Sequence, residues 1–114
     1  MMALRGDVWV VDLDPTRGHE QAKMRPCVIV SDDRFNRSAS GLVVIVPLTS
    51  VDRAMPWHVR VTPEDGGVRQ DSWAMVDQVR TVSRERLVGD PWGQVSSTVM
   101  AAIEERLRLL LGLT

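Results

Sequence analysis

The stretch "RPCVIVS", residues 25–31, decides the fold. Its residues 27–30 are all apolar, and three of the four are β-branched. A short continuous apolar run of this kind, opened by a proline, predicts a strand that is buried on both faces. The segments on either side of it in the chain are therefore expected to supply the strands and helix that cover it.

Further strands are predicted on both sides of this run. Residues 5–15, "RGDVWVVDLDP", alternate in polarity and end in Asp14–Pro15, which is turn chemistry. Residues 42–50, "LVVIVPLTS", form a strongly apolar strand, in which Pro47 predicts an edge position or a bulge because proline cannot donate to a sheet ladder. Residues 57–63 alternate, which places His58 on the outward face.

The second half of the chain predicts shorter elements. Residues 71–83 form a fifth strand with a break near Asp77 and Gln78, residues 84–87 a turn of helix, and residues 92–95 a short sixth strand. Residues 96–113 then change to helical spacing, with a cap at Ser96 or Ser97 and a stop at Gly112. The apolar face of this helix is expected to be Val99, Ile103, Leu107, Leu110 and Leu111.

These elements predict a mainly β fold with a terminal α-helix. Five or six short strands in so few residues favour a small β-barrel, because closure removes exposed sheet edges, and the helix would close it. The length of 114 residues predicts one domain, 1–114. No signal peptide or membrane-spanning window is present, so the sequence predicts a cytoplasmic protein without a membrane partner.

Composition limits the possible chemistry. The net charge of −1 implies that any anion site must come from local placement of Arg and Lys. Cys27 is the single cysteine, which excludes an intrachain disulfide and a cysteine metal cluster, and its context predicts a buried, inert thiol. No phosphate loop, dinucleotide fingerprint or metal-spaced His/Cys set occurs, so we expect no cofactor and no metal.

Polar side chains gather instead near predicted strand ends, and this set suits a phosphodiester. It comprises His19, Glu20, Gln21, Lys23, Arg25, Thr49, Ser50, Asp77, Gln78, Arg80 and Thr81. A guanidinium such as that of Arg25 can clamp phosphate oxygens, a threonine hydroxyl can donate to them, and a histidine can transfer protons near neutral pH. If the substrate is RNA, its 2′-OH is a built-in nucleophile and no metal is required.

Ordinary structural explanations remain open for the same residues. Arg25 before a proline, Thr49 at a strand end and His19 in a polar loop are each compatible with simple solvation. Asp77 in an apolar strand needs a partner, and Arg80 or a backbone donor can be a structural one. The four tryptophans can stack on bases or anchor the core, and nothing in the sequence singles one out.

The chain resembles the MazF/PemK/Kid toxins of bacterial type II toxin–antitoxin systems. The resemblance lies in "RGDVWVVDLDPTRGHEQAKMRPCVIVS", "VVIVPLTS" and "DSWAMVDQVRTVSRERL", in the same order, followed by the amphipathic helix. It implies an SH3-like barrel with a C-terminal helix, a homodimer, and metal-independent, sequence-specific cleavage of single-stranded RNA. A 2′,3′-cyclic phosphate and a 5′-OH are the expected products.

The resemblance also implies roles for individual residues. The catalytic pair of the chromosomal branch falls on Arg25 and Thr49, and its RNA contacts fall on Glu20, Gln21 and Gln78. The plasmid Kid branch uses a His, an Arg and an Asp. His19 and Asp77 match the first and last, whereas Met75 stands at the arginine position, so that site is incomplete.

We therefore rank Arg25 and Thr49 first, with His19 and Asp77 as catalytic contributors. Lys23, Ser50 and Arg80 complete the expected substrate-binding set. Because arginine is always protonated, Arg25 suits a charge clamp better than a base, and His19 can supply the proton acceptor.

The expected partners are single-stranded RNA, a MazE/PemI-like antitoxin and a second copy of the chain. Leu109 and Leu113 on the outer face of the terminal helix, with a tryptophan, are the candidate apolar interface. Two other functions stay open: a non-enzymatic gyrase poison like CcdB, which shares the fold, and an SH3-like module that binds RNA or protein without chemistry.

Overall fold

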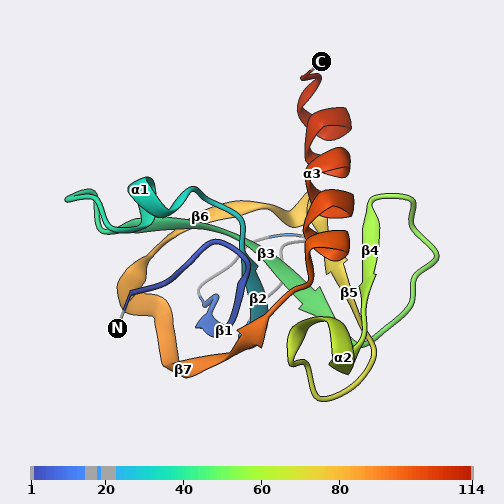
Figure 1. The fold of residues 1–114 in the computed structure, drawn as a ribbon, viewed down its shortest axis with the longest axis horizontal. Coiled ribbons are helices and arrows are strands. Elements are labelled where there is room, and N and C mark those ends of the chain that lie inside the picture. The colour runs from blue at the N-terminus through green and yellow to red at the C-terminus, as the bar shows by residue number, and fades with distance from the viewer. Residues whose placement is uncertain (1, 15–17, 19–22, 114) are drawn as a thin grey trace.

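The computed structural model describes residues 2–14, 18 and 23–113, and its strands form one antiparallel sheet (Figure 1). The strands are β1 (Asp7–Asp12), β2 (Met24–Ile29), β3 (Leu42–Thr49), β4 (His58–Val61), β5 (Ser72–Met75), β6 (Arg80–Ser83) and β7 (Leu87–Gln94). The helices are α1 (Asp33–Asn36), α2 (Pro63–Gly66) and α3 (Ser97–Leu111), with 3-10 turns η1 (Val76–Gln78) and η2 (Arg84–Arg86).

The prediction of a mainly β fold with a terminal helix is confirmed. The strand order is β4-β5-β3-β2-β1-β7, and β6 also pairs with β3. β4 and β7 stand at the two ends of this order, and the described strands show no pairing between them. The sheet is therefore barrel-like in its curvature but is not closed into a complete barrel.

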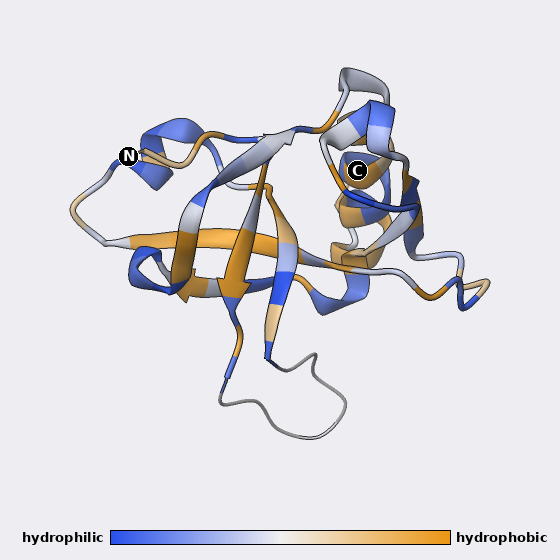
Figure 2. Cartoon of the chain, turned by 90° about the horizontal axis from the view of Figure 1, so that it is seen from below, coloured by the Kyte–Doolittle hydropathy of each residue, from blue (hydrophilic) through white to orange (hydrophobic). Residues whose placement is uncertain are grey.

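β2 is covered on both faces, as its apolar run predicts. Val28 belongs to one buried cluster, which includes Val46, Leu48 and Ile103 of α3. Cys27 and Ile29 belong to a second buried cluster on the other face. Figure 2 shows the central strands largely in the hydrophobic colour. Each fully buried Val or Ile side chain stabilises the fold by about 1.5–3 kcal/mol, so β2 anchors both clusters.

Pro47 does not mark an edge strand. β3 is central, and Pro47 is paired in register with Cys27 of β2. On its other side β3 pairs with β6 through Leu42 to Ile45 and with β5 through Leu48 and Thr49. Pro47 lies where the partner changes from β6 to β5, so its missing N–H faces a gap in the ladder and leaves no bond unmade.

The break predicted at Asp77 and Gln78 is confirmed, because η1 separates β5 from β6 there. The turn predicted at residues 84–87 is η2. The predicted short sixth strand at 92–95 is instead the end of β7, which begins at Leu87. Gly89, with φ 69°, and Pro91 interrupt the sequence pattern of β7, so the pattern does not predict the first half of this strand.

The terminal helix α3 packs against β4 and η1 and extends beyond the sheet (Figure 1). Ser96 caps its start by accepting from Val99 N, and Gly112 ends it in the left-handed conformation, as predicted. Val99 and Ile103 are buried, but Leu111 is 59% exposed because the last turn passes the sheet edge. No described helix is long and apolar enough to span a membrane.

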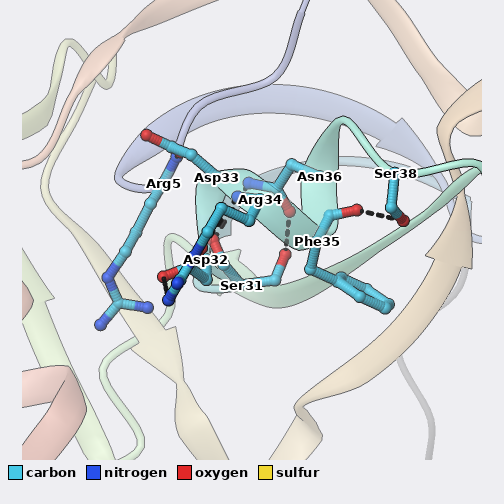
Figure 3. A network of polar contacts seen from close by, with 8 residues as sticks. All are labelled: Arg5, Ser31, Asp32, Asp33, Arg34, Phe35, Asn36 and Ser38. Atoms are coloured by element: carbon cyan, nitrogen blue, oxygen red, sulfur yellow. Dashed lines mark hydrogen bonds and ion pairs between the residues drawn. The ribbon is translucent and has the colours of Figure 1, made fainter.

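The end of β2 and the start of β3 are joined by a polar network around α1 (Figure 3). Ser31 Oγ donates to Asn36 Oδ1 and accepts from Val44 N at 2.9 Å, and Asn36 Nδ2 donates to Ser31 O at 3.0 Å. The guanidinium of Arg5 donates to Val30 O and forms an ion pair with Glu104 of α3. This network holds one end of the β2–β3 pair in place.

Candidate functional site

A pocket of about 370 Å³ lies at the opposite end of the β2–β3 pair, where β2 begins and β3 ends. Four residues expected from the sequence line it: Lys23, Arg25, Thr49 and Ser50. Its other polar walls come from Arg69, Gln70, Ser72 and Trp92. Of the described lining residues three are cationic and none is acidic, so the pocket is positive in a chain of net charge −1.

Arg25 is held at the strand start by its pairing with Val11 of β1 and by the following Pro26. Its Nη1 donates to Leu48 O at 3.4 Å, a long hydrogen bond. Its Nε is buried and has no hydrogen-bond partner within the described part of the chain. A buried donor on a cation is costly unless it is paired, so this guanidinium is suited to receive an anion.

Thr49 ends β3 and is 4% exposed. Its Oγ1 accepts a hydrogen bond from Val51 N at 3.2 Å, which fixes the hydroxyl and leaves its proton to donate. Ser50 follows it and is exposed. Arg25 and Thr49 thus bring a charge clamp and a neutral donor to the same pocket, from neighbouring strands.

Lys23 enters the pocket from a strained backbone. Its φ of 65° is in the left-handed region, which a residue with a Cβ rarely adopts. Asp14 Oδ1 accepts from Lys23 N at 2.8 Å, and Leu13 N donates to Lys23 O at 3.0 Å. These two bonds hold the strained conformation beside β1, and strain of this kind concentrates at functional sites.

Cys27 comes directly after Pro26, which lines the pocket, and its side chain is fully buried. Burial raises the pKa of its thiol to about 12, although the positive charges of Arg25 and Arg80 act in the opposite direction. The thiol is therefore protonated at neutral pH and is inert, as predicted. Arg80 begins β6, where it is paired in register with Ile45 of β3.

Asp77, Gln78 and Arg80 are not among the described residues that line the pocket. Asp77 Oδ1 lies 3.6 Å from His58 Nε2 instead. The prediction that His58 faces outward is wrong: its side chain is 6% exposed, with Asp77 of η1 beside it. Met75, at the arginine position of the Kid-type site, is 1% exposed and belongs to the interior.

His19, Glu20 and Gln21 lie outside the described residues. Among the residues that are described, no three His, Cys, Asp or Glu side chains gather as metal ligands would.

Sequence reasoning missed the second wall of the pocket, formed by Arg69, Gln70, Ser72 and Trp92. Trp92 was one of four tryptophans with no distinguishing signal, and Arg69 lies in a turn that carries no motif. Nearby glycines were the available clue. Gly66 and Gly67 precede Arg69, and Gly93 follows Trp92. Because glycine often marks a place where another backbone approaches closely, these positions could have predicted that the two segments lie together.

Comparison with known proteins gives the chain a family and close structural relatives. Residues 4–111 match the family described as PemK-like, MazF-like toxin of type II toxin–antitoxin system. Endoribonuclease MazF9 of Mycobacterium tuberculosis is 39% identical over 117 residues, covering 98% of each chain.

Two solved structures share the fold over nearly their whole length. MazF of Deinococcus radiodurans superimposes with a TM-score of 0.86 and 25% identity, covering 99% of each chain. An endoribonuclease in complex with its cognate antitoxin, from a mycobacterial species, gives a TM-score of 0.79 and 31% identity, covering 98% of this chain and 97% of the other.

Proposed function

This chain belongs to the family of PemK-like, MazF-like toxins of type II toxin–antitoxin systems, and we propose that it cleaves single-stranded RNA in the pocket at the ends of β2 and β3. The observation that carries the proposal is Arg25, whose buried Nε lacks a described partner, beside the fixed hydroxyl of Thr49. Three cations and no acid among the described lining residues favour a phosphodiester substrate.

In the proposed reaction, the ribose 2′-OH attacks the adjacent phosphorus and the bond from phosphorus to O5′ breaks. The products are a 2′,3′-cyclic phosphate and a 5′-OH. Arg25 binds the non-bridging oxygens and stabilises the charge that grows on them, and Thr49 donates a hydrogen bond to the same oxygens. Because the nucleophile belongs to the substrate, the proposed reaction uses no metal ion.

Proton transfer needs a second group, because arginine is always protonated. We assign the acceptor of the 2′-OH proton to His19, because histidine is the side chain type suited to proton transfer near neutral pH, and the departing O5′ takes up a proton from solvent water. Asp77 pairs with His58, so its proposed contribution acts at a distance from the pocket lining. The remaining proposed RNA contacts are Glu20, Gln21, Lys23, Ser50, Gln78 and Arg80.

The test is cleavage of a long single-stranded RNA by the purified chain in EDTA, followed by end-group analysis. We expect discrete fragments that end in a 2′,3′-cyclic phosphate, and cleavage by Arg25→Ala that is slower by about 10²- to 10³-fold. The matched control is Arg37→Ala, which removes an exposed arginine at the end of α1 and should cut like the wild type. Intact RNA across several sequences would contradict the proposal and favour a gyrase poison or a binding module.

We further propose two protein partners for this toxin in the cytoplasm, where its RNA substrate occurs. A cognate antitoxin would cover the positive pocket with an acidic or apolar segment, and a related endoribonuclease has been solved with its antitoxin. A second copy of the chain would cover the end of α3 and the residues after it, where Leu109, Leu111 and Leu113 are each about 60% exposed. A monomer at micromolar concentration in sedimentation would contradict the homodimer.

A further inference from the structure

Arg69 and Trp92 form a stacked pair in the wall of the pocket that holds Arg25 and Thr49. The guanidinium carbon of Arg69 lies 4.3 Å from the centroid of the Trp92 ring, which is cation–π geometry. Arg69 is exposed and Trp92 is half-buried, so the pair presents flat surface to solvent beside the proposed cleavage site. Single-stranded RNA is typically bound by stacking of its bases on such aromatic and guanidinium planes.

The pair is held in place by a close crossing of two backbones. Gly67 ends α2 with φ +70°, and a Cβ there would lie 2.6 Å from Trp92 O. A Cβ on Gly93 would be in ordinary van der Waals contact with the Gly67 Cα, at 3.4 Å. Ser96 N donates to Asp65 O at 2.6 Å and ties the end of β7 to α2. The segment carrying Arg69 is thus fixed against the strand carrying Trp92.

Hydrogen-bonding groups lie directly beside this flat surface. Gln70 is exposed, lines the pocket, and carries an amide that can both donate and accept. Ser72 Oγ donates to Gln70 O at 2.9 Å, which fixes the backbone from which that amide projects. A base edge needs this combination of donor and acceptor, whereas a phosphate needs donors only. The second wall of the pocket is therefore equipped for a base, and Arg25 for a phosphate.

We propose that Arg69 and Trp92 form a base-binding subsite: the base of a nucleotide next to the cleaved phosphodiester stacks on the pair, and Gln70 contacts its edge. This inference rests on the proposed endoribonuclease function. It assigns sequence preference at one flanking position to residues outside the Arg25–Thr49 motif. The pocket volume of about 370 Å³ lies in the lower part of the range of about 300–1,000 Å³ for ligand pockets, which suits one nucleotide.

The experiment separates stacking from simple charge. After cut sites are mapped on a long RNA, a short RNA spanning the main site is made with one abasic nucleotide at each flanking position in turn. Wild type, Arg69→Lys and Trp92→Leu are compared by kcat/KM. Arg69→Lys keeps the charge and loses the plane, and Arg37→Lys is the matched control at an exposed arginine outside the pocket.

We expect the wild type to lose about tenfold in kcat/KM at one abasic position, the size of effect that loss of one base stack produces. Both variants should lose a similar factor in kcat/KM on the intact RNA. An abasic nucleotide at that position should not lower their kcat/KM further, because the stack is already absent. Arg37→Lys should behave as the wild type. Arg69 is exposed, so its variant remains informative if Trp92→Leu does not fold.

Two outcomes overturn the inference in distinguishable ways. RNA that is cut by the wild type, cut far more slowly by Arg25→Ala, and cut by Arg69→Lys with unchanged kcat/KM and unchanged abasic profile overturns the subsite alone. RNA that the folded wild type leaves intact overturns the proposed function and the subsite with it.

Discussion

At one end of the β2–β3 pair, Ser31 and Asn36 bury their polar groups against each other, whereas at the other end Arg25 and Thr49 direct theirs to a pocket. Both ends belong to the same pair of strands, whose central residues are buried in the core. Asn36 is fully buried, and its side chain is bonded through both its oxygen and its nitrogen (Figure 3). Arg25 Nε is also buried but has no partner among the described residues.

The difference separates polar groups that hold the fold from polar groups that await a ligand. Buried polar atoms in proteins are nearly always hydrogen-bonded, and a satisfied network rigidifies the elements around it. A buried polar atom without a hydrogen-bond partner weakens the fold and persists where function requires it. The α1 end should therefore respond to mutation in stability, and the pocket end in activity.

Replacement of Arg25 by Ala should show the largest effect on activity. Loss of a donor that stabilises developing charge typically lowers kcat by about 10²- to 10³-fold. Since the guanidinium makes only a long bond to Leu48 O and its buried Nε has no described partner, its removal should lower the free energy of unfolding by no more than about 1 kcal/mol. Cleavage kinetics and urea unfolding measured on the same sample check both parts. Strong destabilisation would show that Arg25 holds the fold.

Replacement of Asn36 by Ala should give the opposite result. It removes the donor to the Ser31 carbonyl and the acceptor of the Ser31 hydroxyl proton, and an unsatisfied buried group costs about 1–3 kcal/mol. We expect the free energy of unfolding to fall by about 2–3 kcal/mol, while cleavage per folded molecule stays unchanged. Ser40→Ala, an exposed change in the same connection, is the control. Loss of cleavage in a folded Asn36→Ala protein would remove the distinction between the two ends.

Replacement of Thr49 by Val tests the pocket end more finely. Valine keeps the shape of the buried side chain and removes the hydroxyl that accepts from Val51 N. A hydrogen bond to a charged group contributes about 1.5–3 kcal/mol, so cleavage should fall by about 10- to 100-fold. Thr49→Ser keeps the hydroxyl and should stay close to the wild type. Equal activities for the Val and Ser variants would show that Thr49 donates nothing to the substrate.

The sequence predicts the pocket end better than the α1 end. Arg25 and Thr49 were expected together because a family motif places them, and the flanking strands follow from apolar runs. The partner of Arg5 is Glu104, which is 99 residues away, and no local pattern could reveal it. His58 shows the same limit, because its alternation with valines predicts an outward position and gives no sign that Asp77 of η1 lies beside it.

Cys27 lies between the two ends on β2 and reports how far the open pocket reaches into the core. The pKa of its thiol is raised by burial from 9.0 to about 12, so the folded state keeps the proton that the unfolded state releases. The contribution of the protonated thiol to the free energy of unfolding is therefore complete below pH 9, and it is lost as the pH rises from 9 to 12. The loss amounts to about 1.4 kcal/mol for each pH unit in that window.

Between pH 8 and pH 10, the free energy of unfolding of the wild type should therefore fall by about 1.4 kcal/mol more than that of Cys27→Ala. Urea unfolding at the two pH values measures this difference, and groups that titrate alike in both proteins cancel from it. If the pH dependence of the two proteins is parallel, the thiol has an ordinary pKa and water reaches it from the pocket. The water-accessible region of the pocket would then extend past Arg25 to the middle of β2 and would include Cys27. A steeper fall for the wild type confines the open end to the first residues of the strand.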